Sequence, residues 1–244
     1  MPALVELHVR YRLQTAYAIH GDSEHSSHVD RSVERGPDGW PLIPASSWRG
    51  RVRAQLESLL RALNVPVCYP PAPANTCPHD AAVLRRLRPY GRWFCPVCDL
   101  FGSAWHPSRV QFDDLVHLHR PRGTIAVAER VSVSINRSTG SAEEQHLTSF
   151  EAAGGDEALH TLTGRVRGYL EPVQVGLLVT ALRLPTHFGA EKARGLGLIG
   201  TLEIETTQRT HPWSSPAVVD EKTVESWVEQ ALEEVTRLAA PAAV

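Results

Sequence analysis

The chain has 244 residues, of which 42% are hydrophobic and 21% are charged. This length can bury a core in one or two domains, and the composition excludes a disordered, collagen-like or coiled-coil chain. The formal net charge of -2 means that nucleic-acid binding would need a local basic patch. No apolar stretch is long enough to cross a bilayer and no secretory leader is evident, so we expect a soluble, cytoplasmic protein without a membrane partner.

The first part of the chain predicts a strand, a long loop and a helix. Apolar and polar residues alternate over residues 5–11, which predicts a strand buried on one face. Residues 14–41 are polar and form a connection longer than usual, and such loops are often functional. The stretch IPASSWRGRVR then opens a helix whose apolar stripe begins at Trp48 and continues to Leu63.

The second part predicts the same kinds of element again. We expect strands at 109–119, 124–135 and 160–171, a helix at 172–184, a last strand after the glycines near 197, and a helix at 220–238. The order β-α-β, insertion, β-α-β is the split βαβ pattern of an α+β, ferredoxin-like or RRM-like domain. We therefore expect one domain over residues 1–244, with residues 64–98 as an insertion.

The four cysteines of the chain all lie in this proline-rich insertion. The pair Cys95 and Cys98 has the two-residue gap of a zinc site, and Cys68 and Cys77 supply a second pair. Two disulfides are disfavoured without a secretory signal, and a CxxC redox site would leave the second pair unexplained. We expect a structural zinc ion held by four thiolates, with His79 as the reserve ligand.

Two further segments are candidate phosphate sites. The helix start carries two hydroxyls, Ser46 and Ser47, and two cations one turn apart, Arg49 and Arg53. A solvated basic face with ordinary serine caps explains these residues equally well. The second segment is glycine-rich and carries two cations, Lys192 and Arg194, between its glycines. A ligand can approach the backbone closely at its glycines, which are Gly189, Gly195, Gly197 and Gly200. A tight turn into a strand is the alternative explanation of this glycine-rich segment. The segment matches neither the Walker nor the Rossmann phosphate-binding pattern.

The histidines give weaker signals. His20, His25 and His28 lie in the polar loop without the spacing of a helical metal site, so most are expected to be solvated. None of the GxSxG, HExxH and DxDxDG patterns occurs. Asp113 and Asp114 follow alternating strand residues and are expected to mark a strand end.

Four motifs in order resemble the RAMP superfamily. They are HVDRSVERGPDGWPLIPASSWRGRVR, CPVCDLFGS, SINRSTGSAEEQHLTSFE and GAEKARGLG, and the resemblance covers roughly residues 5–205. Within the superfamily, the chain is similar to the repeated backbone subunit of type III CRISPR effector complexes. Where that pattern commonly reads IPGSSLKG, this chain has Ala45 for glycine and Arg49 for lysine.

The resemblance implies an RRM-like palm that holds CRISPR guide RNA, with a hairpin thumb at residues 134–150 that wedges between bases. It implies partners of three kinds: guide RNA, complementary target RNA, and other copies of the chain together with other type III subunits. The residues that would contact RNA are Ser46, Ser47, Arg49, Arg53, Asn136, Arg137, Lys192, Arg194, Gly195 and Gly197.

The resemblance also implies an activity. Relatives that cut target RNA carry an aspartate in the loop before the IPGSS-like motif, and that position falls on Asp30. Asp30 would act with Mg²⁺ as a divalent-metal-dependent endoribonuclease within the complex. Asp22 and Glu24 in the same loop are alternative metal ligands, and Asp38 is expected to shape the GPDG turn.

Three functions stay open from the sequence. The first is a guide-binding backbone subunit that cleaves target RNA at regular intervals. The second is a non-catalytic scaffold or capping subunit of the same complex, in which Asp30 only caps a turn. The third is a stand-alone, histidine-dependent RNA-processing endoribonuclease that uses His20, His25 or His28.

Overall fold

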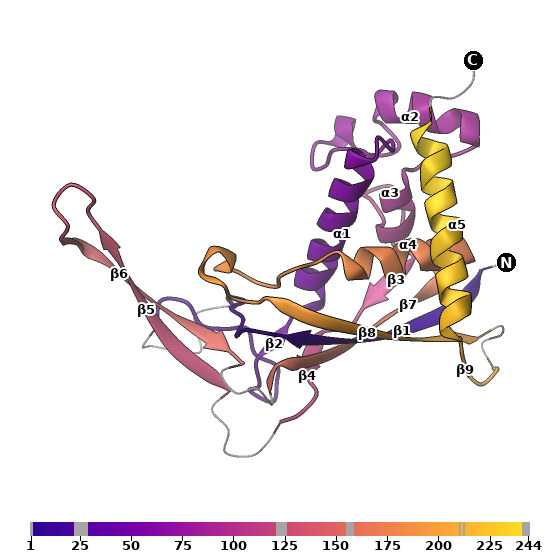
Figure 1. The fold of residues 1–244 in the computed structure, drawn as a ribbon. Helices are drawn as coiled ribbons and strands as arrows, with labels where there is room; N and C mark the ends of the chain where they lie inside the picture. Colours follow the sequence, from indigo (N-terminus) through magenta and orange to yellow (C-terminus); the bar gives the residue numbers. More distant parts are fainter. Residues whose placement is uncertain are drawn as a thin grey trace.

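The computed structural model describes residues 2–21, 29–120, 126–154, 159–209, 211 and 213–240. These residues form an α+β fold in which helices cover one face of an antiparallel sheet and a long hairpin projects sideways from it (Figure 1). Within the described ranges, no helix combines the length and apolar character needed to cross a bilayer.

The sheet has the topology that the alternating sequence predicts. Strand β1 (Ala3–Leu13) lies between β7 (Thr161–Leu170) and β8 (Ile199–Arg209) and is antiparallel to both. On its other edge β7 pairs with β3 (Val110–Phe112) and β4 (Leu115–His117). The order β4-β7-β1-β8 is that of a split βαβ domain, so the antiparallel α+β fold is confirmed.

Three helices pack on one face of the sheet (Figure 1). They are α1 (Ala45–Ala62), α4 (Pro172–Arg183) and α5 (Glu221–Ala239). Helix α1 buries the predicted apolar stripe from Trp48 to Leu60, whereas Leu63 lies just past its end and is exposed. Helices α4 and α5 pack so closely that a Cβ on Gly176 would lie 1.9 Å from the carbonyl oxygen of Trp227. The opposite face of the sheet carries charged residues, including the ion pair of Arg10 with Glu203 at 2.8 Å.

The insertion contains two short helices that the sequence does not predict. Helix α2 (Ala81–Leu87) begins at Asp80, whose carboxylate accepts hydrogen bonds from two backbone N–H groups, and α3 (Pro96–Phe101) begins with proline. Two single turns, η2 (Pro73–Asn75) and η3 (Arg88–Tyr90), complete this segment. Elements of six or seven residues are too short to show the periodicity of a helix.

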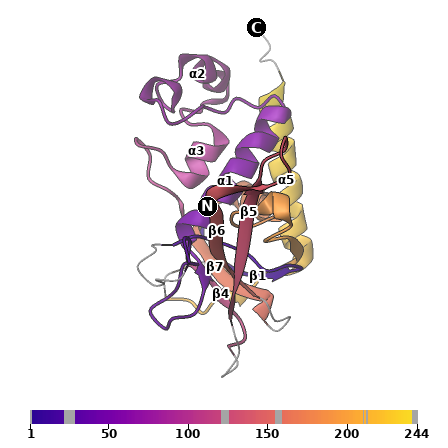
Figure 2. The same ribbon diagram turned by 90° about the vertical axis from the view of Figure 1, so that its left-hand side faces the viewer.

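The projecting hairpin consists of β5 (Val127–Ile135) and β6 (Ala142–Ala153), which form a separate two-stranded sheet (Figures 1 and 2). At its base, single backbone bridges join Ala153 to Tyr17 and Phe150 to Arg31. The stretch NRSTGSAEEQHLTS is polar and shows no strand pattern, yet its second half forms the outer part of β6. The predicted strand at 109–119 is instead split into β3 and β4 around the two aspartates.

Short elements complete the fold. Strand β2 (Leu42–Ile43) pairs with β4, and β9 (Ala217–Val218) pairs with the end of β8. A single turn, η5 (Lys192–Arg194), lies in the glycine-rich loop between α4 and β8.

Candidate nucleic-acid interface and metal centre

The four cysteines meet at one buried point of the molecule. Their sulfur atoms all lie within 4.8 Å of one another, and none of them forms a disulfide. The sulfur of Cys68 lies 3.8 Å from that of Cys95 and 3.4 Å from that of Cys98. Thiolates on one tetrahedral zinc ion, with Zn–S distances of about 2.3 Å, lie about 3.8 Å apart. The cluster therefore has the ligand type, number and spacing of a structural zinc site.

The surroundings of the cluster also fit a bound cation. Backbone N–H groups of Cys95 and Cys98 donate to the sulfurs of Cys77 and Cys95, both at 3.4 Å, as expected around a metal-thiolate centre. His79 is exposed, contacts the ring of Trp105 at 4.9 Å, and does not belong to the cluster. The four thiols can thus hold a metal ion without the predicted reserve ligand.

The four thiols shift one another's pKa values in opposite directions. Hydrogen bonding with Cys77 lowers the pKa of Cys68, whereas hydrogen bonding with Cys68 raises the pKa of Cys98. Once one sulfur carries a negative charge, its neighbours resist ionisation because the charges are close together. A divalent cation removes this conflict, since it stabilises all four thiolates together.

Arg49 and Arg53 point toward the cysteine module, which we define as residues 64–102. Arg49 donates hydrogen bonds to the carbonyl oxygen of Phe101 and, at 3.4 Å, to Ser108. Arg53 donates to the carbonyl oxygen of Gly102 at 3.0 Å and lies 4.0 Å from the sulfur of Cys98. These two arginines therefore bind the carboxyl end of α3 and connect it to α1.

A groove opens on another side of α1, near its first turn. It has a volume of about 500 Å³, and Ser47, Arg51, His20 and Gly189 contribute to its lining. Nε of Arg51 and both ring nitrogens of His20 are buried without a hydrogen-bond partner among the described residues. Burial lowers the pKa of His20, which favours its neutral ring. We call this the α1 groove; its polar atoms suit a ligand rich in hydrogen-bonding oxygen.

Ser46 differs from Ser47 in its position. It is exposed at the start of α1 and does not line the α1 groove. The backbone N–H of Ala45 next to it donates to the carboxylate of Asp114 at 2.7 Å. The helix start is thus partly occupied by an acidic side chain of the protein itself, and the polar side chains that α1 contributes to the groove are Ser47 and Arg51.

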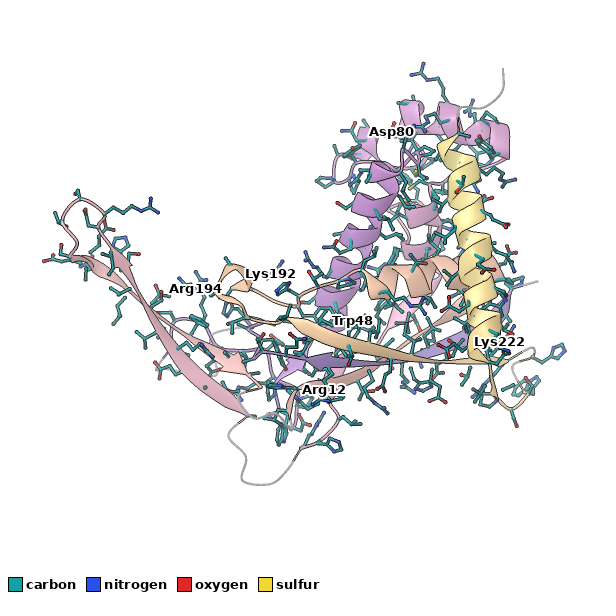
Figure 3. All side chains as sticks on the ribbon, in the orientation of Figure 1. Arg12, Trp48, Asp80, Lys192, Arg194 and Lys222 are labelled. Atoms are coloured by element: carbon teal, nitrogen blue, oxygen red, sulfur yellow. The ribbon has the colours of Figure 1, made fainter. Side chains whose placement is uncertain are left out.

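The glycines of the predicted ligand loop have two different roles. Gly197 is buried at φ +72°, and a Cβ there would lie 1.9 Å from the carbonyl oxygen of Phe188, so it serves the packing of the turn. Gly195 is exposed at φ +81°, and nothing lies within 4 Å of its Cβ position, which leaves room for a ligand. Lys192 and Arg194 are exposed on the same loop, between the helices and the hairpin (Figure 3).

Asp30 lies at the base of the hairpin. Its carboxylate accepts the backbone N–H of Ser149 at 2.7 Å, and its own N–H donates to the carbonyl oxygen of Ser149 at 3.1 Å. Asp30 is exposed, and its neighbour Arg31 lies 4.0 Å from Glu191 of the glycine-rich loop. Three segments distant in sequence, namely the polar loop, β6 and the glycine-rich loop, therefore meet here.

A second hollow joins the glycine-rich loop to the hairpin. It has a volume of about 310 Å³, and Arg130, Ser132, Phe150 and Arg194 contribute to its lining. The guanidinium of Arg194 lies 6.0 Å from the ring centre of Phe150, and the ring of His20 lies 6.2 Å from the same ring. We call this the hairpin cleft. Because His20 lines the α1 groove, the two hollows are adjacent.

The tip of the hairpin holds Asn136 and Arg137. The side-chain oxygen of Asn136 accepts hydrogen bonds from the N–H and hydroxyl of Ser138, at 2.9 and 2.7 Å, so Asn136 shapes the turn. Arg137 is exposed. Along the strands, four large apolar side chains are exposed by 45% or more, namely Val131, Val133, Ile135 and Leu147.

The chain matches the family model of the RAMP superfamily over residues 11–200. It belongs to the RAMP superfamily. The match covers the carboxyl end of β1, α1, the cysteine module, the hairpin, β7, α4 and the glycine-rich loop of this RAMP protein, while most of β1, most of β8 and α5 lie outside it. Among curated proteins, a search finds no match to the chain.

Sequence reasoning missed several residues of this RAMP protein. Arg51 lies within the IPASSWRGRVR stretch but is not distinguished there from Arg49 and Arg53, Arg130 belongs to none of the motifs, and only the fold places the two in the α1 groove and the hairpin cleft. Asp38 shapes its turn as predicted, since its carboxylate accepts the N–H of Trp40 at 3.2 Å. The predictions on Asp22, Glu24, His25 and His28 lie outside the described residues.

Proposed function

We propose that this RAMP protein is a CRISPR RNA-binding backbone subunit of a type III effector ribonucleoprotein, which acts in antiviral defence by cleaving complementary target RNA. The observation that carries the proposal is the adjacency of the α1 groove, the hairpin cleft and Asp30. One polynucleotide backbone could follow both hollows, because Phe150 of the hairpin cleft contacts the ring of His20 of the α1 groove.

Guide RNA would be held by its phosphates along this path. In the α1 groove, Ser47 and Arg51 supply a hydroxyl and a guanidinium. Lys192 and Arg194 add two exposed cations, and Gly195 leaves room for the backbone to approach. Contacts of this kind position RNA without reading its sequence. They suit a subunit that must accept any guide.

Two arginines of α1, separated by one residue, allow a matched test of this path. Arg51→Ala should weaken binding of guides of different sequence by a similar factor and reduce the dependence of log K on log salt by about 0.7. Arg49→Ala is the control, because its guanidinium already binds the carbonyl oxygen of Phe101. Equal loss of RNA affinity in both variants, with both folded, would refute the assignment of Arg51. Sequencing of small RNA that copurifies with the protein identifies the guide class independently.

Asp30 is the proposed catalytic residue. Its carboxylate is exposed at the base of the hairpin and is positioned by the N–H of Ser149. When bound there, Mg²⁺ would be held by Asp30 and RNA phosphate oxygens and would stabilise charge at the scissile phosphate. The protein would contribute chiefly by holding the RNA backbone in line for attack by the adjacent 2′-hydroxyl.

Replacement by asparagine separates catalysis from structure at this position. Asp30→Asn removes the negative charge but keeps an oxygen that can accept the N–H of Ser149. In an assembled complex it should lose divalent-metal-dependent cutting while guide and target affinity stay within about two-fold, which corresponds to about 0.4 kcal/mol. Cutting at the native rate by Asp30→Asn would show that Asp30 is not catalytic.

The hairpin would serve as the thumb, and the cysteine cluster would hold structural zinc. Exposed apolar side chains such as Val131 and Leu147 could stack against bases or neighbouring copies, which gives regularly spaced cuts in target RNA. Copies packed head to tail would repeat this arrangement along the guide. Joining the strands near the tip should leave guide binding intact and change the spacing of the cuts; unchanged spacing would exclude this role.

A non-catalytic scaffold or capping subunit is the second candidate. The hydrogen bonds between Asp30 and Ser149 favour it, because they give the carboxylate a structural task. A histidine-dependent endoribonuclease would instead cut without divalent metal. Cutting in excess chelator that is lost in His20→Gln would support that third reading, and no cutting by the native complex would support the scaffold.

A further inference from the structure

The outer edge of β8 is largely unpaired. In the described residues β8 pairs with β1 along one edge, but on its other edge with β9 only at Thr207 and Gln208. At the start of β8, the N–H of Ile199 donates to the carbonyl oxygen of Thr186 at 2.9 Å. Between these contacts, residues 200–205 have no strand on their outer side, a stretch about 20 Å long.

The direction of the backbone groups on this edge follows from one hydrogen bond. The carbonyl oxygen of Thr206 accepts the N–H of Val219 at 2.9 Å, so it points away from β1. Polar groups of alternate residues in a strand point to the same side. Leu202 and Ile204 therefore direct their N–H and C=O groups outward, where they can pair with an added strand.

A groove of about 430 Å³ runs beside this edge, between the sheet and the first turns of α5. Its apolar lining consists of Val179, Leu202, Ile204, Val219 and Val224. Leu202 and Ile204 thus contribute both outward backbone groups and apolar side chains to the same groove.

One buried hydroxyl also points to a ligand. Thr206 lines the groove and is 3% exposed, yet its Oγ1 has no hydrogen-bond partner among the described residues. Buried polar groups are normally hydrogen-bonded, since an unpaired one costs free energy. A strand added beside Thr206 would supply the missing partner.

The charges around the groove select the kind of occupant. Glu203, Glu205 and Glu221 line it. Arg183, which also lines it, is paired with Glu225 at 2.9 Å, and Glu203 is paired with Arg10 of β1 at 2.8 Å, so the lining itself keeps three carboxylates against one guanidinium. This acidic rim repels RNA. It also disfavours a second copy of β8, because antiparallel pairing would place the glutamates of the two copies close together.

We propose that the edge of β8 is a docking site for an extended, basic segment of a partner protein, which adds to the sheet in line with β9. The backbone of the segment pairs with Leu202 and Ile204. Its side chains alternate between the two faces of the sheet. Apolar residues enter the groove, and basic residues meet Glu203 and Glu205 on the other face. The proposal is independent of RNA binding.

A synthetic peptide of alternating arginine and valine, Arg-Val-Arg-Val-Arg-Val with blocked ends, is the probe. Added to the isotope-labelled full chain at low salt, it should shift the NMR signals of Leu202, Ile204 and Thr206 saturably and slow the amide exchange of Leu202 and Ile204. The peptide with glutamate in place of arginine should bind at least ten-fold more weakly. Equal binding of both peptides, or no shifts on β8, would overturn the proposal.

Variants of the edge give a second test. Ile204→Pro removes an outward N–H but no hydrogen bond to β1, and should weaken peptide binding at least ten-fold. Ile204→Val keeps the N–H and should bind as the native chain does. If Ile204→Pro does not fold, the double change Glu203→Gln and Glu205→Gln should still weaken binding about five-fold. RNA affinity should be unchanged in each folded variant. A dimer in sedimentation that Ile204→Pro abolishes would instead assign the edge to a second copy.

Discussion

The cysteine module and the hairpin are both insertions into one sheet-and-helix body, but they are held in opposite ways. The module shares the body's main hydrophobic core, to which its cysteines and residues such as Leu87 and Leu100 belong. The hairpin forms its own two-stranded sheet, and only its base is buried, where Phe150 and Ala152 form a small separate cluster. The module thus stabilises the fold, whereas the outer hairpin contributes little to it.

This difference indicates what each insertion is for. A two-stranded hairpin is marginally stable in water, so a long one with exposed apolar side chains needs a binding partner. A module whose four clustered cysteines lie in the common core, where they can hold a metal ion, is fixed before any partner arrives. Changes in the module should therefore affect stability, and changes in the hairpin should affect binding and cutting.

The largest effect is expected from the cysteines. Replacing Cys95 and Cys98 by serine removes two of four buried ligands, and the binding free energy of a structural zinc ion is free energy of folding. The melting temperature should fall by about 10 °C or more, because 1 kcal/mol corresponds to about 2–4 °C in a protein of this size. Calorimetry with metal analysis measures both quantities, and the native protein should contain about one zinc per chain.

His79→Ala is the matched control for this prediction. His79 lies in the same module but outside the cluster, so its variant should keep the zinc content and the melting temperature of the native chain. A native protein that contains no metal and unfolds at the same temperature in a strong chelator would contradict the zinc assignment.

Much of the module's chemistry could be predicted from the sequence, because cysteine spacing carries the ligand set directly. The directions in which the side chains of the three α1 arginines point could not be predicted from the sequence. Arg49, Arg51 and Arg53 are equally basic in sequence, and only the packing of α3 against α1 turns the first and third toward carbonyl oxygens. The middle one is left in the α1 groove.

The hairpin was predicted from family resemblance more than from residue pattern. Its second strand is polar on both faces over its outer half, so it lacks the alternation that marks a half-buried strand. The contact of Asp30 with Ser149 joins residues 119 positions apart, and no local pattern reports such a pair. The antiparallel sheet itself was predictable because its strands do alternate.

Arg53→Ala should have the second largest effect. It leaves the carbonyl oxygen of Gly102 without its present donor and removes one of the two arginines that donate to the carboxylate of Glu57, the other being Arg61, which costs about 1–3 kcal/mol. Arg51→Ala should change the unfolding free energy by less than about 0.5 kcal/mol, because its Nε has no partner in the described residues. Urea denaturation compares the two; equal losses would mean that the module is not held through Arg53.

Shortening the hairpin should affect stability less. Val133 and Leu147 are register partners, so joining them through Asn-Gly removes the tip and keeps the remaining pairing. The unfolding free energy should change by less than about 0.5 kcal/mol, because the removed residues are mostly exposed. A loss above about 2 kcal/mol in urea denaturation would show that the tip packs against the body and would remove the contrast between the two insertions.

A buried histidine connects the hairpin's exit to the body. Nδ1 of His117 donates to the carbonyl oxygen of Leu159 at 2.8 Å, and Nε2 accepts the hydroxyl of Tyr17 at 3.0 Å. Tyr17 in turn pairs through its backbone with Ala153 at the end of β6. The neutral ring satisfies both contacts. Burial lowers the pKa of His117, and Arg120 acts in the same direction.

The smallest predicted effect is therefore a pH dependence at the hairpin base. In the unfolded chain His117 has the ordinary pKa of about 6.5, so its contribution to stability is present above that pH and is lost as the pH falls toward the lower folded value. Between pH 7.5 and 5.5 the native protein should lose stability, and the protection factors of the amides of Ala153 and Leu159, which correct for the intrinsic pH dependence of exchange, should fall before those in the cysteine module. His117→Gln should flatten this dependence. An NMR titration of the His117 ring with a midpoint above 6.5 would reverse the sign and contradict the prediction.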